Sequence, residues 1–138
     1  MERLSERMNT ASIIAQQFLE SPKYLFRETD RNTIEAKAGV YAIFDQSTGE
    51  TLYVGRTKNL RRRLCSDHLR GPKANARLKK YLAEDEKRKD IMNMDQAKQY
   101  LLNHCYFQYV CENNTRTRGQ LEGLLSYLLD VTYIYEEH

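Results

Sequence analysis

The sequence AGVYAIFDQSTGETLYVG, residues 38–55, decides the fold. Two runs of aliphatic, β-branched and aromatic residues, 39–44 and 51–54, predict two strands. Ser47-Thr48-Gly49 lies between them and suits a three-residue loop whose glycine takes the left-handed conformation. The stretch therefore predicts an antiparallel β-hairpin.

The loop also sets the expected register of the hairpin, because it pairs Gln46 with Glu50. Counting back from that pair places Tyr41 opposite Gly55, on the same face as Tyr53. The missing side chain of Gly55 then leaves room beside the Tyr41 hydroxyl. The opposite face is wholly apolar and consists of Val40, Ala42, Phe44, Leu52 and Val54.

The rest of the chain predicts helices and one further strand around this hairpin. In an N-terminal arm, residues 1–36, apolar residues near helical spacing predict a short helix that Ser21-Pro22 ends. The other expected elements are helices at 58–69, 73–88, 94–102 and 118–129, a strand at 105–111 and a short extended end at 133–135. Because no linker or repeat interrupts the chain, we expect the helical arm to pack on residues 37–138 as one domain.

Composition is typical of a soluble globular protein. The 138 residues are 41% hydrophobic and 30% charged, and no apolar run approaches the roughly 18 residues of a membrane-spanning helix. The charged start, MERLSERMNT, lacks the apolar stretch of a secretory signal. Three cysteines show neither disulfide nor zinc spacing, so we expect a cytoplasmic protein with Cys105 and Cys111 in or near the core.

Positive charge is concentrated in one part of the chain. Between Arg56 and Lys80 there are ten lysines and arginines and a single acid, Asp67, although the net charge of the chain is only +3. Such a block predicts a polyanionic partner, most often nucleic acid, and a solvated helix face is an equally weighted alternative. The candidate phosphate contacts are Arg56, Lys58, Arg61, Arg62, Lys73 and Arg77.

Two of the features that could carry chemistry lie in or directly after the hairpin. The first is the pair Tyr41 and Tyr53, although a tyrosine is a poor base unless a cation lowers its pKa, and strand packing alone also explains the pair. The second is Arg63, which lies on the flank of an apolar helix stripe. A guanidinium offers phosphate a planar fork of donors, whereas the alternative is a surface ion pair with Asp67.

Two other candidates are an acid and a histidine. Glu122 borders the leucine stripe of the last predicted helix, where a carboxylate needs a partner because its desolvation is costly. That partner is either a divalent cation or Arg118, one turn earlier. His68 suits a general base or a phosphate contact, and equally a helix end favoured by the helix dipole.

Taken in order, these motifs resemble the signature of the GIY-YIG nucleases. Gly39-Val40-Tyr41 and Tyr53-Val54-Gly55 resemble the two tripeptides of that family, including their glycines. Arg63, eight residues past the second tripeptide, matches the catalytic arginine of the family. Glu122 matches its metal-binding glutamate. The resemblance spans residues 38–130.

The resemblance implies an α+β fold with a small three-stranded antiparallel sheet flanked by helices. It also implies a metal-dependent endonuclease that hydrolyses nucleic-acid phosphodiester bonds, with DNA as the first expectation. On this template Tyr41 would act as general base or orient the attacking water, and Tyr53 would position it. Arg63 would hold the scissile phosphate, and Glu122 would bind one Mg²⁺ or Mn²⁺. Arg56 stands where relatives often have lysine.

Departures from the family pattern keep other interpretations open. Many relatives have His or Tyr four residues after the arginine, where this chain has Asp67. His68 follows one residue later, off that face of a regular helix. No asparagine matches one that some relatives use near the C-terminus, and residues 69–104 resemble an insertion. The alternatives are a nucleic-acid-binding module that kept the fold and lost turnover, and a domain whose basic helix meets an acidic protein. A homodimer or a partner protein would supply any sequence specificity.

Overall fold

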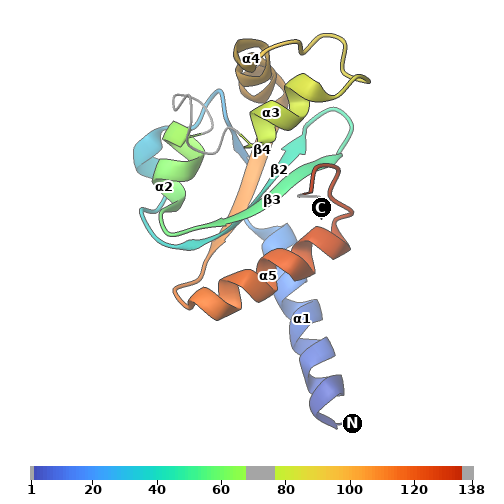
Figure 1. Cartoon of the computed structure of the whole chain (residues 1–138). Coiled ribbons are helices and arrows are strands. Elements are labelled where there is room, and N and C mark those ends of the chain that lie inside the picture. Colours follow the sequence, from blue (N-terminus) through green and yellow to red (C-terminus); the bar gives the residue numbers. More distant parts are fainter. Residues whose placement is uncertain (1, 68–76, 135–138) are drawn as a thin grey trace.

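The computed structural model describes residues 2–67 and 77–134 as an α+β fold. A four-stranded antiparallel sheet with the strand order β1-β4-β2-β3 lies at its centre, and helices cover both faces (Figure 1). The elements are α1 (Glu2–Glu20), β1 (Tyr24–Leu25), η1 (Arg31–Thr33), β2 (Gly39–Asp45), β3 (Thr51–Thr57), α2 (Leu60–Arg62), η2 (Arg63–Asp67), α3 (Arg77–Glu84), α4 (Met94–His104), β4 (Cys105–Cys111) and α5 (Thr115–Leu128). The expected class is confirmed.

The sheet has one strand more than the three expected. The extra strand is β1, which pairs with β4 through Tyr24 opposite Phe107 and Leu25 opposite Tyr106. Two residues are too few for an alternating pattern in the sequence, so this strand could not be predicted. Because β1 adds to the far side of β4, β3 stays at the opposite edge of the sheet.

The register of the hairpin is confirmed at the end that carries the family motifs. Tyr41 lies opposite Gly55, and Ile43 lies opposite Tyr53. Gly49 has a φ angle of +76°, the left-handed conformation expected of it in the loop. The predicted pairing of the motif residues is therefore correct, although the structure reaches it through a different loop closure and a β-bulge.

The register near the loop differs from the prediction. Asp45, not Gln46, closes the loop by donating its N–H to the carbonyl of Glu50 at 2.9 Å. A β-bulge between Ile43 and Phe44 leaves Leu52 as one extra residue on β3, and one extra residue reverses the side to which its neighbours point. Leu52 consequently packs among the residues of the tyrosine face and not, as expected, with Phe44.

Each face of the sheet carries its own apolar core. The tyrosine face packs against α2, η2, α3 and α4, and its fully buried residues include Tyr41, Ile43, Leu52, Leu60, Leu64, Leu78, Leu82 and Leu101. The other face packs against α1 and α5 and buries Phe18, Val40, Ala42, Phe44, Val54, Leu121 and Leu125. The sheet is therefore sandwiched between two helical layers, which explains why every residue of β2 is buried.

The helix expected at 58–69 is irregular. Asn59 caps α2 by accepting a hydrogen bond from the N–H of Arg62 at 3.1 Å. After Arg62 the coil widens into one π turn, η2, and such turns are rare and frequent at functional sites. The helices expected at 73–88, 94–102 and 118–129 correspond to α3, α4 and α5, with shifted ends. Residues 68–76, with Gly71-Pro72, lie outside the described residues.

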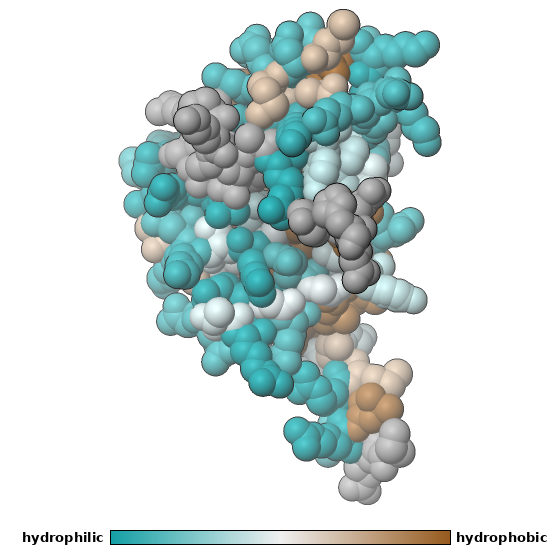
Figure 2. Space-filling view, viewed as in Figure 1, coloured by the Kyte–Doolittle hydropathy of each residue, from teal (hydrophilic) through white to brown (hydrophobic). Residues whose placement is uncertain are grey.

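The surface is mostly polar, and among the described residues large apolar side chains are exposed on α1, on and just before α4, and around the end of α5. The N-terminal half of α1 projects from the body, and hydrophobic colour gathers over it in Figure 2. Leu4 and Met8 are exposed there. Cys105 is buried as expected, whereas Cys111 at the end of β4 is exposed, so its expected place in or near the core is wrong. None of the described helices combines the length and apolarity needed to cross a membrane.

Candidate active site at the edge of β3

The candidate site wraps around the exposed edge of the sheet at β3. Because successive residues of a strand point to opposite faces, Tyr53 faces one helical layer and Val54 faces the other. Both residues nevertheless line the same cavity of about 530 Å³. Arg77 at the start of α3 and Glu122 of α5 line it too. The edge position of β3 thus brings side chains from both layers together.

Tyr41 and Tyr53 lie side by side at this edge, as the register predicted. Their ring centroids are 6.3 Å apart. Tyr41 is fully buried, and a Cβ atom at Gly55 would come within 2.5 Å of its hydroxyl oxygen. The glycine therefore provides the space that the hydroxyl occupies.

Arg63 is the cation whose charge acts on the Tyr41 hydroxyl. Burial is the main cause that raises the pKa of Tyr41 above its ordinary value of 10, and the charge of Tyr53 also raises it. The charge of Arg63 and a hydrogen bond with it lower the pKa of Tyr41, but they do not offset burial. Tyr41 is accordingly a neutral hydroxyl near pH 7 that lies beside a guanidinium.

Arg77 reaches the second tyrosine from the other side of the site. Burial raises the pKa of Tyr53, while the charge of Arg77 and a hydrogen bond with it act in the opposite direction. The basic block predicted Arg77 only as a phosphate contact, so its place beside Tyr53 was missed. The sequence holds no signal for this contact, because it depends on the packing of α3.

Glu122 pairs with Arg56 and not with Arg118. The Nε atom of Arg56 lies 3.9 Å from a carboxylate oxygen of Glu122. Gly119, one turn before Glu122, makes room for this arginine, since a Cβ atom there would lie 2.2 Å from its Nη1 atom. Arg118 is buried instead and donates to the carbonyl groups of residues 112 and 113. The alternative of an ion pair within α5 is therefore wrong.

The donor chemistry around Glu122 fits a divalent ion that keeps most of its water. Among the described residues no group of three or more His, Cys, Asp or Glu side chains gathers as an all-protein metal site. Mg²⁺ does not require one, because it is commonly held by one or two carboxylates and retains several waters. The Glu122 side chain is 35% exposed and faces the cavity, so its oxygens are accessible to such an ion.

The other predicted phosphate contacts differ in their exposure to solvent. Lys58 and Arg62 are exposed, as expected. Arg61 is half-buried, because its Nε atom donates to the carbonyl of Ile34 at 2.8 Å, so its expected position toward solvent is only partly met. Lys73 and His68 lie outside the described residues, and so does the side chain of Asp67, the alternative partner of Arg63.

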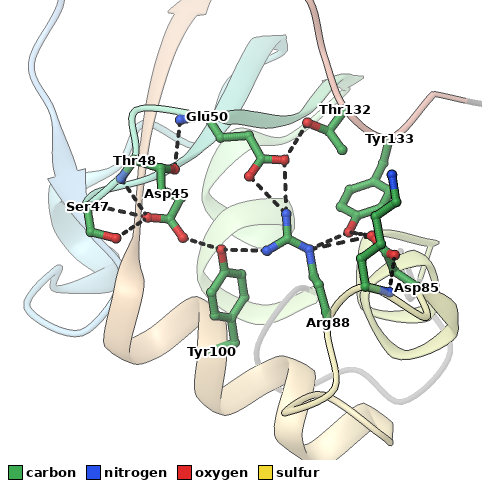
Figure 3. A network of polar contacts seen from close by, with 10 residues as sticks. Asp45, Ser47, Thr48, Glu50, Asp85, Arg88, Tyr100, Thr132 and Tyr133 are labelled. Atoms are coloured by element: carbon green, nitrogen blue, oxygen red, sulfur yellow. Dashed lines mark hydrogen bonds and ion pairs between the residues drawn. The ribbon is translucent and has the colours of Figure 1, made fainter.

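A polar network that the sequence analysis missed holds the C-terminal segment beside the cavity (Figure 3). Arg88 is its centre, binding both carboxylate oxygens of Glu50 at 2.9 and 3.0 Å. It also donates to the hydroxyl of Tyr133, which in turn donates to Asp85. Tyr133 lines the cavity, so the network fixes one of its walls.

The comparison with known families adds one result to this geometry. A family model described as the GIY-YIG catalytic domain matches residues 37–122. The match begins just before Gly39 and ends on Glu122, so it includes both tripeptides, Arg63 and the late glutamate. No curated protein matches the chain.

Proposed function

The chain belongs to the GIY-YIG family of nucleases, and on that premise we propose that it is an endonuclease that hydrolyses DNA phosphodiester bonds with a divalent metal ion. GIY-YIG nucleases typically use such an ion. We place the nuclease domain at residues 37–138, with the preceding helical arm packed on it through Phe18. The free cysteines fit a reducing cytoplasm.

One observation carries this proposal. Side chains that are far apart in the sequence meet around the edge of β3, where Tyr41 and Tyr53 lie with Arg63 on one side and Glu122 on the other. A cation that can hold a phosphate, a carboxylate that can bind a metal ion and two hydroxyl groups that can orient water together suit phosphodiester hydrolysis.

Arg63 would hold the scissile phosphate. Its planar, permanently charged guanidinium can donate two hydrogen bonds to phosphate oxygens and offset the negative charge that develops on them. Arg63 already lies beside the Tyr41 hydroxyl, so a phosphate held there would be next to that hydroxyl. Arg56, Lys58 and Arg62 would contact phosphates further along the strand.

Tyr41 would orient the attacking water. Its raised pKa keeps the hydroxyl protonated near pH 7, which favours the orienting role over that of a phenolate base. Tyr53, with a raised pKa of its own, would hold the same water from its other side. A metal ion at Glu122, when bound, would stabilise charge on the leaving oxygen.

His68 remains a candidate base, because an imidazole changes charge between about pH 5 and 8 and can exchange a proton with water. It stands one residue past the family position, which is Asp67 in this chain.

The test is a cleavage assay on supercoiled plasmid and on branched DNA, with Mg²⁺, with Mn²⁺ and with chelator. We expect metal-dependent strand scission that Glu122→Ala and Tyr41→Phe both abolish or strongly reduce. Tyr109→Phe is the matched control, because Tyr109 lies opposite Tyr41 on β4, farther from β3, where its ring stacks on that of Tyr24. Salt-sensitive DNA binding without scission, unaffected by either variant, would instead identify a binding module that has lost turnover.

A further inference from the structure

The cavity at the edge of β3 extends past Glu122 into a recess that the proposed hydrolysis does not use. From α5 the recess is lined by Gly123 and Tyr127, which lie on the same side of the helix as Glu122. From the C-terminal segment it is lined by Val131 and Ile134. Its walls therefore combine apolar and aromatic side chains with the polar groups of Ser126 and Asp130, next to the residue that would hold the metal.

The C-terminal wall of the recess is held in place by the fold. Asp130 has a φ angle of +50°, a left-handed conformation that turns the chain back after α5. The N–H groups of Thr132 and Tyr133 then donate to carbonyl groups at the start of β3, at 2.9 and 3.1 Å. The Arg88 network binds the Tyr133 hydroxyl (Figure 3). The recess is thus a preformed feature.

The opposite wall offers a flat, accessible ring. Tyr127 is 78% exposed, so its ring is accessible to a ligand. Gly123, one turn earlier, leaves the floor open, since a Cβ atom there would meet nothing within 4 Å. Ile134 across the recess is 58% exposed. A planar group can therefore enter between Tyr127 and the C-terminal segment.

Charge indicates what kind of group enters. Among the described residues, the charged residues that line the cavity are Arg77 and the acids Glu122 and Asp130. A phosphate would be repelled from the deeper part, whereas an uncharged aromatic ring would not. Bases stack on aromatic side chains whatever their sequence, because every base has a π face. The volume of about 530 Å³ lies within the range of small-ligand pockets, which suits one nucleotide.

We propose that this recess binds an unpaired nucleobase adjacent to the scissile phosphate, stacked on Tyr127, so that the substrate is DNA with a single-stranded segment at the cleavage site. The inference rests on the proposed function and names the substrate class for it. A base inside a duplex is already stacked and paired, and taking it out costs a few kcal/mol. The recess therefore favours single strands, flaps and unpaired junctions over intact duplex.

The experiment measures binding in chelator, where no cleavage occurs. Fluorescence anisotropy gives the affinity for a short single-stranded DNA and for the blunt-ended duplex of that strand with its complement. Tyr127→Ala removes the ring, Tyr127→Phe keeps it, and Leu128→Ala is the control, because Leu128 is 53% exposed on the same helix but does not line the cavity. A purine analogue whose fluorescence is quenched on stacking reports contact with the ring directly.

We expect Tyr127→Ala to weaken single-strand binding by roughly 5- to 10-fold and to leave duplex binding within about twofold. Tyr127→Phe retains the affinity, and Leu128→Ala has no effect. Equal loss for both DNAs, or no loss for either, overturns the inference. Plasmid cleavage by the unmodified protein in Mn²⁺ tests the proposed function separately. Cleavage without single-strand selectivity refutes only the recess, whereas selective binding without cleavage refutes only the nuclease.

Discussion

The hydroxyl of Tyr41 occupies the space that a side chain at Gly55 would need. A Cβ atom at position 55 would lie 2.5 Å from that oxygen and 2.6 Å from the carbon that carries it. Tyr41 is fully buried between the sheet and the helical layer, so its ring has no open space into which it could shift. The glycine of one tripeptide and the tyrosine of the other are therefore sterically coupled.

Gly55→Ala should consequently destabilise the protein and displace the Tyr41 hydroxyl. Overpacking of this kind costs about 1–3 kcal/mol in the free energy of unfolding, which urea titration measures. Gly123→Ala is the matched control, because its Cβ atom meets nothing within 4 Å. That change should stabilise α5 by up to about 1 kcal/mol. Equal stability of Gly55→Ala and the unmodified protein would contradict the coupling.

Arg56→Gln should tighten metal binding and weaken DNA binding. The guanidinium lies 3.9 Å from the Glu122 carboxylate and competes with a cation for it. Both side chains are partly exposed, so the pair contributes about 0.2–1 kcal/mol and its loss should raise Mn²⁺ affinity by up to about fivefold. Calorimetry measures this change. The slope of log affinity against log salt concentration should become shallower by the equivalent of about one phosphate contact. Unchanged or weaker Mn²⁺ binding would show that Arg56 does not compete for the carboxylate.

His68→Ala should lower the cleavage rate by about 10²- to 10⁴-fold, the usual contribution of a general acid or base. Asp67→Asn should have a much smaller effect, although Asp67 occupies the family position by residue count. The measurement is the single-turnover rate in Mg²⁺ at saturating protein. The reason for this order of effects is that a neutral imidazole can take a proton near pH 7, whereas a carboxylate is a much weaker base. A larger loss in Asp67→Asn would mean that the acid itself takes part.

Asp45→Asn should remove part of the acid sensitivity of the fold. Burial alone would raise the pKa of Asp45, but hydrogen bonds from Tyr100, Ser47 and Thr48 outweigh it and lower the pKa from 3.8 to about 2. Because the pKa is lower in the folded than in the unfolded state, the carboxylate stabilises the fold above pH 4, and this stabilisation is lost as the pH falls toward 2. The shift corresponds to roughly 2 kcal/mol in the free energy of unfolding.

Urea titrations at pH 5 and near pH 2 test this prediction. The free energy of unfolding of the unmodified protein should fall by about 2 kcal/mol more than that of Asp45→Asn over this interval. Thr48→Ala is a useful comparison, because the backbone N–H of Thr48 still reaches Asp45 and most of the dependence should remain. An identical decrease in all three proteins would show that Asp45 is not the group responsible.

The sequence by itself determined the hairpin and the position of the motifs on it. Gly49 takes the left-handed conformation expected of it, and Tyr41 lies opposite Gly55 as the hairpin pattern predicted. Asn59 is a strong helix cap, so the start of α2 could be predicted to within two residues. These features depend on residues that are close in the chain, and local sequence therefore encodes them.

The tertiary structure alone decided which side chain pairs with Glu122 and on which face of the sheet Leu52 packs. Arg118 is one helical turn from Glu122 and was the natural partner by spacing, yet Arg56 from β3 takes that place because Gly119 leaves room for it. The bulge that moves Leu52 to the tyrosine face likewise leaves no trace in the alternating pattern. Periodicity reports neighbours within one element, whereas contacts between elements depend on strand order and on the space that each packed layer leaves.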